Sequence, residues 1–221
     1  MTPHDIDRTI HVAAGVLALG FGLAPLLTVK GGPLHRRFGA ITVWLGGLNL
    51  VAALVAVALF APPPALVAAF VAASYQYLSS LRALALRNRG PGWIDAFLTL
   101  GGAAACVWLY VTMGPGTRSW SPVIGYSTIG YTACLCAYDA SRYLWSRVWS
   151  TIRPLDHGLK MTGFYFAMAS AGAGNLLRNY QPWSQVLPSL IGMAVMILLA
   201  ALYLAGSRRA APGRTDADKA P

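Results

Sequence analysis

Seven stretches of this sequence are long and apolar enough to cross a membrane, and they constrain the fold more than any other feature. A helix that spans the hydrocarbon layer needs about 20 mostly apolar residues. The stretches cover residues 10–29, 38–60, 65–86, 93–113, 121–143, 157–177 and 186–206. Only 11% of the 221 residues are charged, whereas soluble domains carry about 25%. We therefore expect an all-α, polytopic membrane bundle of seven transmembrane helices.

Short connections that contain proline or glycine separate the stretches, so consecutive helices should be antiparallel neighbours. No room remains for a separate soluble domain, and we expect residues 1–207 to form one transmembrane domain. Residues 208–221 have few apolar side chains to bury and should form a disordered tail. The opening "MTPHDIDR" lacks a basic leader, so we expect the first stretch to remain as a membrane anchor.

The basic residues predict how the bundle is oriented. If the seven stretches alternate in direction, 14 of the 17 lysines and arginines fall on one side, leaving Arg8, Arg118 and Arg178 on the other. Cytoplasmic loops of membrane proteins are enriched in Lys and Arg. The bias predicts an N-terminus outside and a C-terminus in the cytoplasm of a bacterial plasma membrane. It also accounts for the formal net charge of +10 without a nucleic acid as partner.

Small residues recur at helical spacing on the first two stretches. One face runs through Gly15, Ala18 and Gly22, and the other through Thr42, Gly46 and Asn49. In lipid, small residues permit close approach of two backbones, so we expect these faces to be helix contacts. Cys134 and Cys136 are two residues apart and should face different directions, which favours packing over a metal pair.

His35 and His157 are the candidate chemical groups. They occur in similar contexts, "PLHRRFG" and "PLDHGLK", each soon after a proline that suits the start of a helix. The predicted orientation places both at the cytoplasmic level. His11 should lie near the opposite face as a hydrogen-bonded residue of a helix start.

Two imidazoles at one depth, on different helices, can ligate a metal ion or the iron of a b-type haem from opposite faces. Arg36, Arg37 and Lys160 are close in sequence and can pair with haem propionates. We therefore predict a cofactor site with His35 and His157 as metal ligands. A quinone headgroup held by the same histidines is one alternative, and simple anchoring of helix ends at the interface is another.

We also predict structural roles for several other polar residues. Asp139 and Arg142, three residues apart on one helix, should form an ion pair in preference to a proton relay. Asp156 is a candidate N-cap of the sixth helix, and Asp95 should cap the fourth helix or face Arg89. Gln76 should bond across helices. A polar interior shared by Asn49 and Asn175 is a further possibility.

The segments "HVAAGVLALGFGLAPLLTVKGGPLHRRFGAITVW", "YQYLSSLRAL" and "HGLKMTGFYFAMASAGAGN" with "LPSLIG" resemble a bacterial family of predicted integral membrane proteins of unknown function. The resemblance covers most of residues 11–192 and implies a multi-pass inner-membrane protein. A weaker likeness is to the b-type cytochromes of transmembrane reductases. Because the third to fifth stretches contain no histidine, this likeness implies at most one haem, on the cytoplasmic side.

These observations favour a redox protein that holds one b-type haem, or a quinone, for electron transfer. Two further classes stay open. One is a non-enzymatic accessory or lipid-binding membrane subunit. The other is a small-solute carrier, which would need a polar cavity near Asn49, Asn175 and Gln76.

Overall fold

The computed structural model describes residues 1–87, 89–113 and 121–209, and all regular secondary structure in these ranges is helical. The predicted all-α class is confirmed. The described residues form seven α-helices and one short 3-10 helix, with these bounds: α1 Pro3–Leu27, α2 Pro33–Leu59, α3 Pro64–Ala85, α4 Trp93–Met113, α5 Pro122–Ser141, α6 Ser146–Leu176, η1 Arg178–Tyr180 and α7 Trp183–Arg209. The predicted tail lies beyond the described residues, apart from the last turn of α7.

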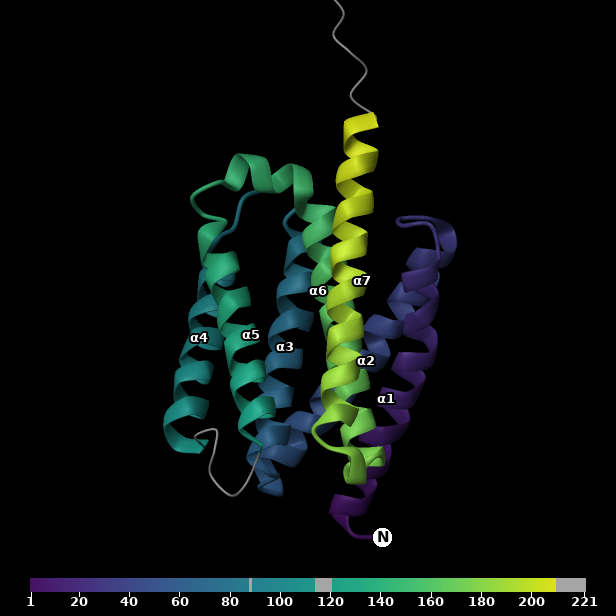
Figure 1. Ribbon diagram of the computed structural model, residues 1–221, viewed down its shortest axis with the longest axis vertical. Helices are drawn as coiled ribbons and strands as arrows, with labels where there is room; N and C mark the ends of the chain where they lie inside the picture. Colours follow the sequence, from purple (N-terminus) through teal and green to yellow (C-terminus); the bar gives the residue numbers. More distant parts are fainter. Residues whose placement is uncertain (88, 114–120, 210–221) are drawn as a thin grey trace, which may run out of the picture.

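The long helices form one bundle in which consecutive helices run in opposite directions (Figure 1). The N-terminus and the links after α2 and α6 lie at one end, at the bottom of the view. The links after α1, α3 and α5 lie at the other end, toward which α7 also runs. The alternation that the sequence predicts is therefore present, and it gathers the basic residues of these three links at a single end.

Four helices among the described residues are long and apolar enough to cross a membrane: α1, α2, α4 and α7. Fewer than a third of the residues in the apolar stretch of each of these helices are buried, and in α7 the buried share is only 6%. The less apolar α3 lies at the centre, in contact with α2, α4, α5 and α6. Its polar side chains therefore face protein, where other helices can satisfy their hydrogen bonds, and not lipid.

The small-residue faces of α1 and α2 are helix contacts, as predicted. A Cβ on Gly15 would lie 2.9 Å from the amide nitrogen of Asn49, and one on Gly46 would lie 2.8 Å from the ring of Phe164. Ala18 is fully buried. Glycine is needed at these positions because the facing side chains occupy the space that a methyl group would take.

The sixth helix begins about ten residues earlier than predicted. α6 starts at Ser146 and contains Pro154 in its interior, so Asp156 is a mid-helix residue and its predicted role as N-cap is wrong. Proline removes one backbone hydrogen bond and bends a helix without always ending it. Figure 1 shows the consequence: the first turns of α6 lie across the end of the bundle before the helix turns down into it.

Candidate functional site

The two predicted histidines face backbone carbonyls through the same ring nitrogen. His35 Nδ1 lies 3.2 Å from the carbonyl oxygen of Pro25. His157 Nδ1 lies 3.3 Å from the carbonyl oxygen of Ser80 and 2.8 Å from its hydroxyl. A carbonyl only accepts hydrogen bonds, so the tautomer that bonds to these carbonyls carries its proton on Nδ1, whereas the Ser80 hydroxyl can pair with either tautomer of His157. In the carbonyl-bonded tautomer, Nε2 is left with a free lone pair, the arrangement found in metal-bound histidines.

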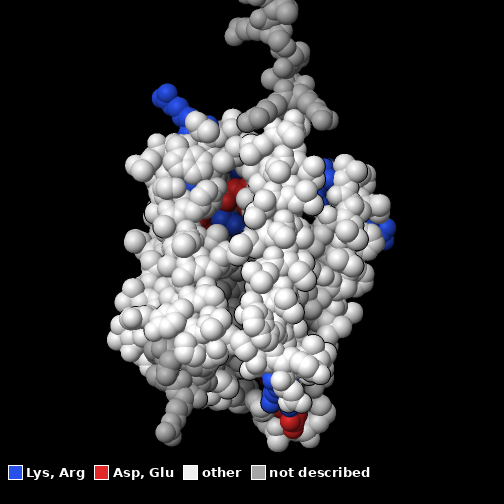
Figure 2. All heavy atoms as spheres, in the orientation of Figure 1, with Lys and Arg blue, Asp and Glu red and all other residues white. Residues whose placement is uncertain are grey.

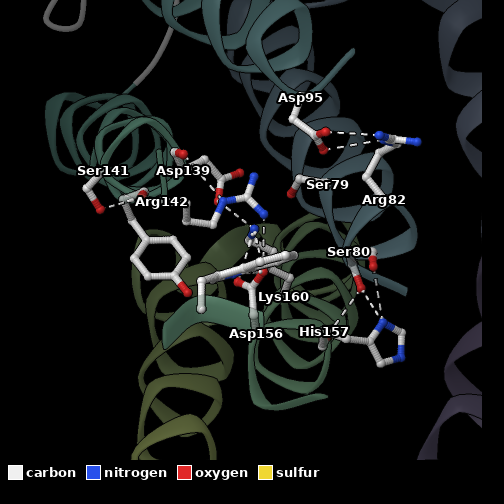
Figure 3. A network of polar contacts seen from close by, with 12 residues as sticks. Ser79, Ser80, Arg82, Asp95, Asp139, Ser141, Arg142, Asp156, His157 and Lys160 are labelled. Carbon is white, nitrogen blue, oxygen red and sulfur yellow. Dashed lines mark hydrogen bonds and ion pairs between the residues drawn. The ribbon is translucent and has the colours of Figure 1, made fainter. Parts of the chain in front are cut away.

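The residues predicted to share the histidine site are divided among three places. His35 lies on α2 against the carbonyl of Pro25, and His157 lies on α6 against Ser80 of α3. Arg36 and Arg37 are exposed on the first turn of α2. Lys160 follows His157 by one helical turn but projects to a different side of α6, as Figure 3 shows. The structure thus gives the two histidines separate partners, Pro25 and Ser80, and directs the lysine toward α5.

Lys160 belongs to a buried charge cluster that joins α5 to α6. Its four members, none more than 3% exposed, are Asp139, Arg142, Asp156 and Lys160. Lys160 Nζ lies 2.5 Å from Asp139 Oδ1 and 3.1 Å from Asp156 Oδ1. Arg142 contacts the same two carboxylates at 3.2 and 3.4 Å. Each carboxylate therefore meets both cations, and the cluster is neutral when all four groups are ionised.

Neutral donors complete the cluster. The Tyr75 hydroxyl on α3 donates to Asp139 Oδ2 at 2.7 Å, and the Trp149 indole donates to Asp156 Oδ2 at 3.3 Å. The Arg142 guanidinium also lies 4.9 Å from the centre of the Trp149 ring, a distance at which a cation is attracted to an aromatic face. The cluster is thus held by three helices, and its charges are compensated locally.

Part of this cluster could be read from the sequence. The predicted ion pair of Asp139 with Arg142 is confirmed. Sequence reasoning missed the pairing of Asp156 with Lys160, although they are four residues apart on one helix. The spacing was the available signal, and the assignment of Asp156 as an N-cap concealed it.

Of two other polar expectations, the cap predicted for Asp95 is confirmed, whereas its alternative partner Arg89 and the interior predicted for Asn49 and Asn175 are wrong. Asp95 accepts a hydrogen bond from the Gly92 amide, consistent with a cap, but its charged partner is Arg82 at 2.9 Å and not Arg89. Asn49 and Asn175 share no polar interior. Asn49 donates to the backbone carbonyl of His11 at 2.7 Å, whereas Asn175 is exposed.

His11 is hydrogen-bonded, as predicted, but α1 begins at Pro3, so His11 lies inside the helix and its predicted place at a helix start is wrong. Its Nδ1 lies 3.1 Å from the carbonyl oxygen of Asn49. Since Asn49 also donates to the His11 carbonyl, the two residues join α1 to α2 through a reciprocal pair of contacts. This pair has a structural explanation and needs no ligand.

A cavity of about 280 Å³ lies between α3, α5, α6 and α7. Figure 2 shows a hollow along the gap between α5 and α7, with charged atoms visible only at its upper end. Alanine, valine, leucine, isoleucine, methionine and phenylalanine side chains make most of the wall. The polar residues that line it are Gln76, Ser127, Thr128, Tyr131, Ser170, Gln185 and Ser189. No charged residue is among the described residues of this lining.

The ends of the cavity differ in how their polar groups are satisfied. At the end toward the centre of the bundle, Tyr131 donates to Gln76 Oε1 at 3.1 Å, and Gln76 Nε2 donates to Ala72 at 3.2 Å. The predicted cross-helix bond of Gln76 is therefore confirmed. At the other end lies the first turn of α7, where Gln185 Oε1 is buried without a hydrogen-bond partner.

The cavity is not the one that a solute carrier was expected to have. It reaches Gln76 but is lined by neither Asn49 nor Asn175, and its wall is mainly apolar. Such a pocket suits a ligand that dissolves in the bilayer, because apolar walls bind an apolar body and a few polar groups orient it.

No protein-family description, no curated protein and no solved structure matches the chain. The resemblance to the bacterial membrane family and to the b-type cytochromes stays a prediction.

Proposed function

We propose that this chain is a multi-pass protein of the bacterial plasma membrane that binds one lipid-soluble molecule in the cavity between α3, α5, α6 and α7. The molecule enters from the bilayer through the gap between α5 and α7. The observation that carries the proposal is the cavity itself, with its apolar wall, its few polar groups and its uncharged lining. The activity belongs to the lipid-binding or quinone-binding class.

In this proposal all seven long helices span the membrane. The N-terminus lies outside, and the ends that carry Lys30, Arg87 and Arg147 lie in the cytoplasm. The positive-inside bias supports this orientation. The less apolar α3 and α6 are shielded from lipid in part by neighbouring helices, so their composition is compatible with a span.

Ligand-induced stabilisation tests the cavity. A ligand that binds only the folded protein raises its melting temperature. The probes are a short-chain ubiquinone, its quinol and farnesol, each added to the protein in detergent. We expect at least one probe to raise the melting temperature saturably. Ala167→Phe on α6 and Ala69→Leu on α3 should abolish the increase, because both residues line the cavity.

The matched control is Ala104→Phe on the exposed face of α4, which adds a ring outside the cavity and should leave the response intact. If no probe stabilises the protein, or if Ala167→Phe and Ala69→Leu respond as the control does, the proposal is wrong.

A second candidate function is electron transfer through one b-type haem held by His35 and His157. The observation that favours it is that Nδ1 of each ring faces a backbone carbonyl, which in the matching tautomer leaves Nε2 free to bind a metal. The donor atoms therefore suit iron, and bound haem would supply one-electron chemistry. Arg36 and Arg37 would be available to its propionates, whereas Lys160 is engaged by two carboxylates.

The absorbance spectrum of protein purified from haem-replete cells tests the second candidate. A Soret band that shifts on reduction, and that His35→Ala and His157→Ala each alter, would support it. His11→Ala is the matched control, because His11 bonds within the α1–α2 pair at the other end of α1. A spectrum without a Soret band would eliminate the haem.

A further inference from the structure

We infer that the ligand of the cavity presents a hydroxyl group to Gln185, at the first turn of α7, with its apolar part extending toward Gln76. This inference rests on the proposed function and names the class of ligand: a lipid-soluble alcohol or phenol, such as a quinol or an isoprenoid alcohol. The observation behind it is an unpaired acceptor at one end of a cavity whose other end is satisfied.

Gln185 Oε1 is buried and has no hydrogen-bond partner. The neighbouring Ser184 Oγ, on the same turn, is also buried and unpartnered. Buried polar atoms are nearly always hydrogen-bonded in folded proteins, so an unpartnered atom of a residue that lines a cavity indicates a missing partner. Of these two residues, Gln185 is the one that lines the cavity.

The turn that carries Gln185 is fixed against α6. Ser170 Oγ donates to the Gln185 carbonyl, and Ser189 Oγ donates to the same carbonyl at 3.2 Å. A Cβ on Gly174 would overlap the Gln185 side chain, so the two helices approach closely here. Because the amide is held between packed helices, it has little freedom to find another partner within the protein.

The chemistry of this atom selects the ligand. An amide oxygen only accepts hydrogen bonds, so the ligand must donate one. A quinone offers acceptors alone, whereas a quinol and an alcohol offer an O–H donor. A phospholipid would bring an anionic phosphate, for which the described lining provides no cation. The site therefore suits a neutral hydroxyl better than an oxidised quinone or a phosphate.

The depth of the two ends sets the ligand's direction. The first turn of α7 lies near the end of the bundle that holds the N-terminus (Figure 1), close to where a polar headgroup meets the interface. Toward the centre, the Tyr131 hydroxyl already donates a hydrogen bond to Gln76 Oε1, so this pair does not need a hydrogen bond from the ligand. The polar head is thus placed at Gln185 and the apolar part toward the middle of the membrane.

Matched ligands that differ only in the hydroxyl test this inference. The probes are a short-chain ubiquinol, its dimethyl ether, the corresponding ubiquinone, farnesol and farnesyl methyl ether. Affinity is measured from the dependence of melting temperature on probe concentration. We expect at least one hydroxyl probe to bind about tenfold or more tightly than its ether, the ratio typical for one otherwise unpaired buried acceptor. Comparison of ubiquinol with farnesol then distinguishes the two sources of the hydroxyl.

The variant Gln185→Leu removes the acceptor and should bring hydroxyl and ether to within about twofold of each other. The control Ser127→Ala removes a cavity hydroxyl that already donates to Ile124, and it should keep the preference. Equal binding of hydroxyl and ether to the wild-type protein, or a preference that survives in Gln185→Leu, overturns the inference and leaves the proposed function standing. Failure of every probe to bind overturns both.

Discussion

The replacement Lys160→Met tests whether the buried charge cluster holds the bundle together. It removes one of two cations and retains a side chain of similar length. Lys160 contributes contacts of 2.5 and 3.1 Å to two carboxylates, and a hydrogen bond to a charged group contributes about 1.5–3 kcal/mol. The packing of the apolar methionine side chain offsets some of that loss. We expect the free energy of unfolding to fall by about 3–5 kcal/mol.

The measurement is reversible unfolding in mixed micelles, with SDS as the denaturant and tryptophan fluorescence as the signal. Trp149, one of seven tryptophans, is fully buried and donates to Asp156, so part of the change in emission comes from the cluster. In a thermal scan the same loss corresponds to a decrease of roughly 6–20 °C, taking 2–4 °C per kcal/mol for a chain of this size. The control Arg36→Met changes an exposed cation and should shift stability by less than about 0.5 kcal/mol.

The double variant Lys160→Met with Asp156→Leu separates charge balance from loss of packing. It leaves Asp139 paired with Arg142, so the remaining cluster is neutral again. We expect its stability to return to within about 1–2 kcal/mol of the wild-type value, because a balanced apolar replacement of a buried ion pair is often tolerated. The reasoning is refuted if the single variant loses less than about 1 kcal/mol, or if the double variant loses the sum of the two single losses.

Three further predictions concern the packing of the bundle. Gly46→Ala should lower the free energy of unfolding by about 1–3 kcal/mol, because the added methyl group overpacks against α6. The control is Gly39→Ala, where a Cβ would meet no atom within 4 Å. In the same unfolding assay this control should be neutral or slightly stabilising. Asn49→Leu should cost about 0.6–1.7 kcal/mol, the range for hydrogen bonds between membrane helices; an unchanged midpoint would contradict the role given to the α1–α2 contact. A membrane-permeant maleimide should label Cys134, which is exposed, and spare the two buried cysteines until SDS unfolds the protein, with mass spectrometry as the readout.

The helices and the α1–α2 contact could be predicted because their signals are local. A run of apolar residues, a proline at a helix start and glycines at helical spacing all act within one segment. For the same reason the pairing of Asp139 with Arg142, three residues apart, was predictable. The boundary of α6 was not, because Pro154 can either start or bend a helix, and the choice depends on how the first turns pack across the end of the bundle.

Side-chain contacts between different helices were harder to predict, because they depend on how each helix is rotated about its own axis. Three arginines lie within 13 residues before Asp95 in the sequence, and only the packed structure selects Arg82 over Arg89. Gln76 was identified as a residue that bonds across helices, but its partner Tyr131 lies 55 positions away. The cavity had no sequence signal, because its wall consists of small and apolar residues that resemble any other helix contact.

The distribution of buried charge restricts what this bundle can accept. Among the described residues, the buried carboxylates are paired: Asp95 with Arg82, and Asp139 and Asp156 with the two cations of the cluster. A charged solute would need a counter-charge inside the membrane, and in the described cluster each charge is already compensated. The described residues that line the cavity carry no charge. If the protein is a carrier, its solute should therefore be neutral. Because the cavity wall is mainly apolar, a molecule that already dissolves in the bilayer fits it better than an ion does.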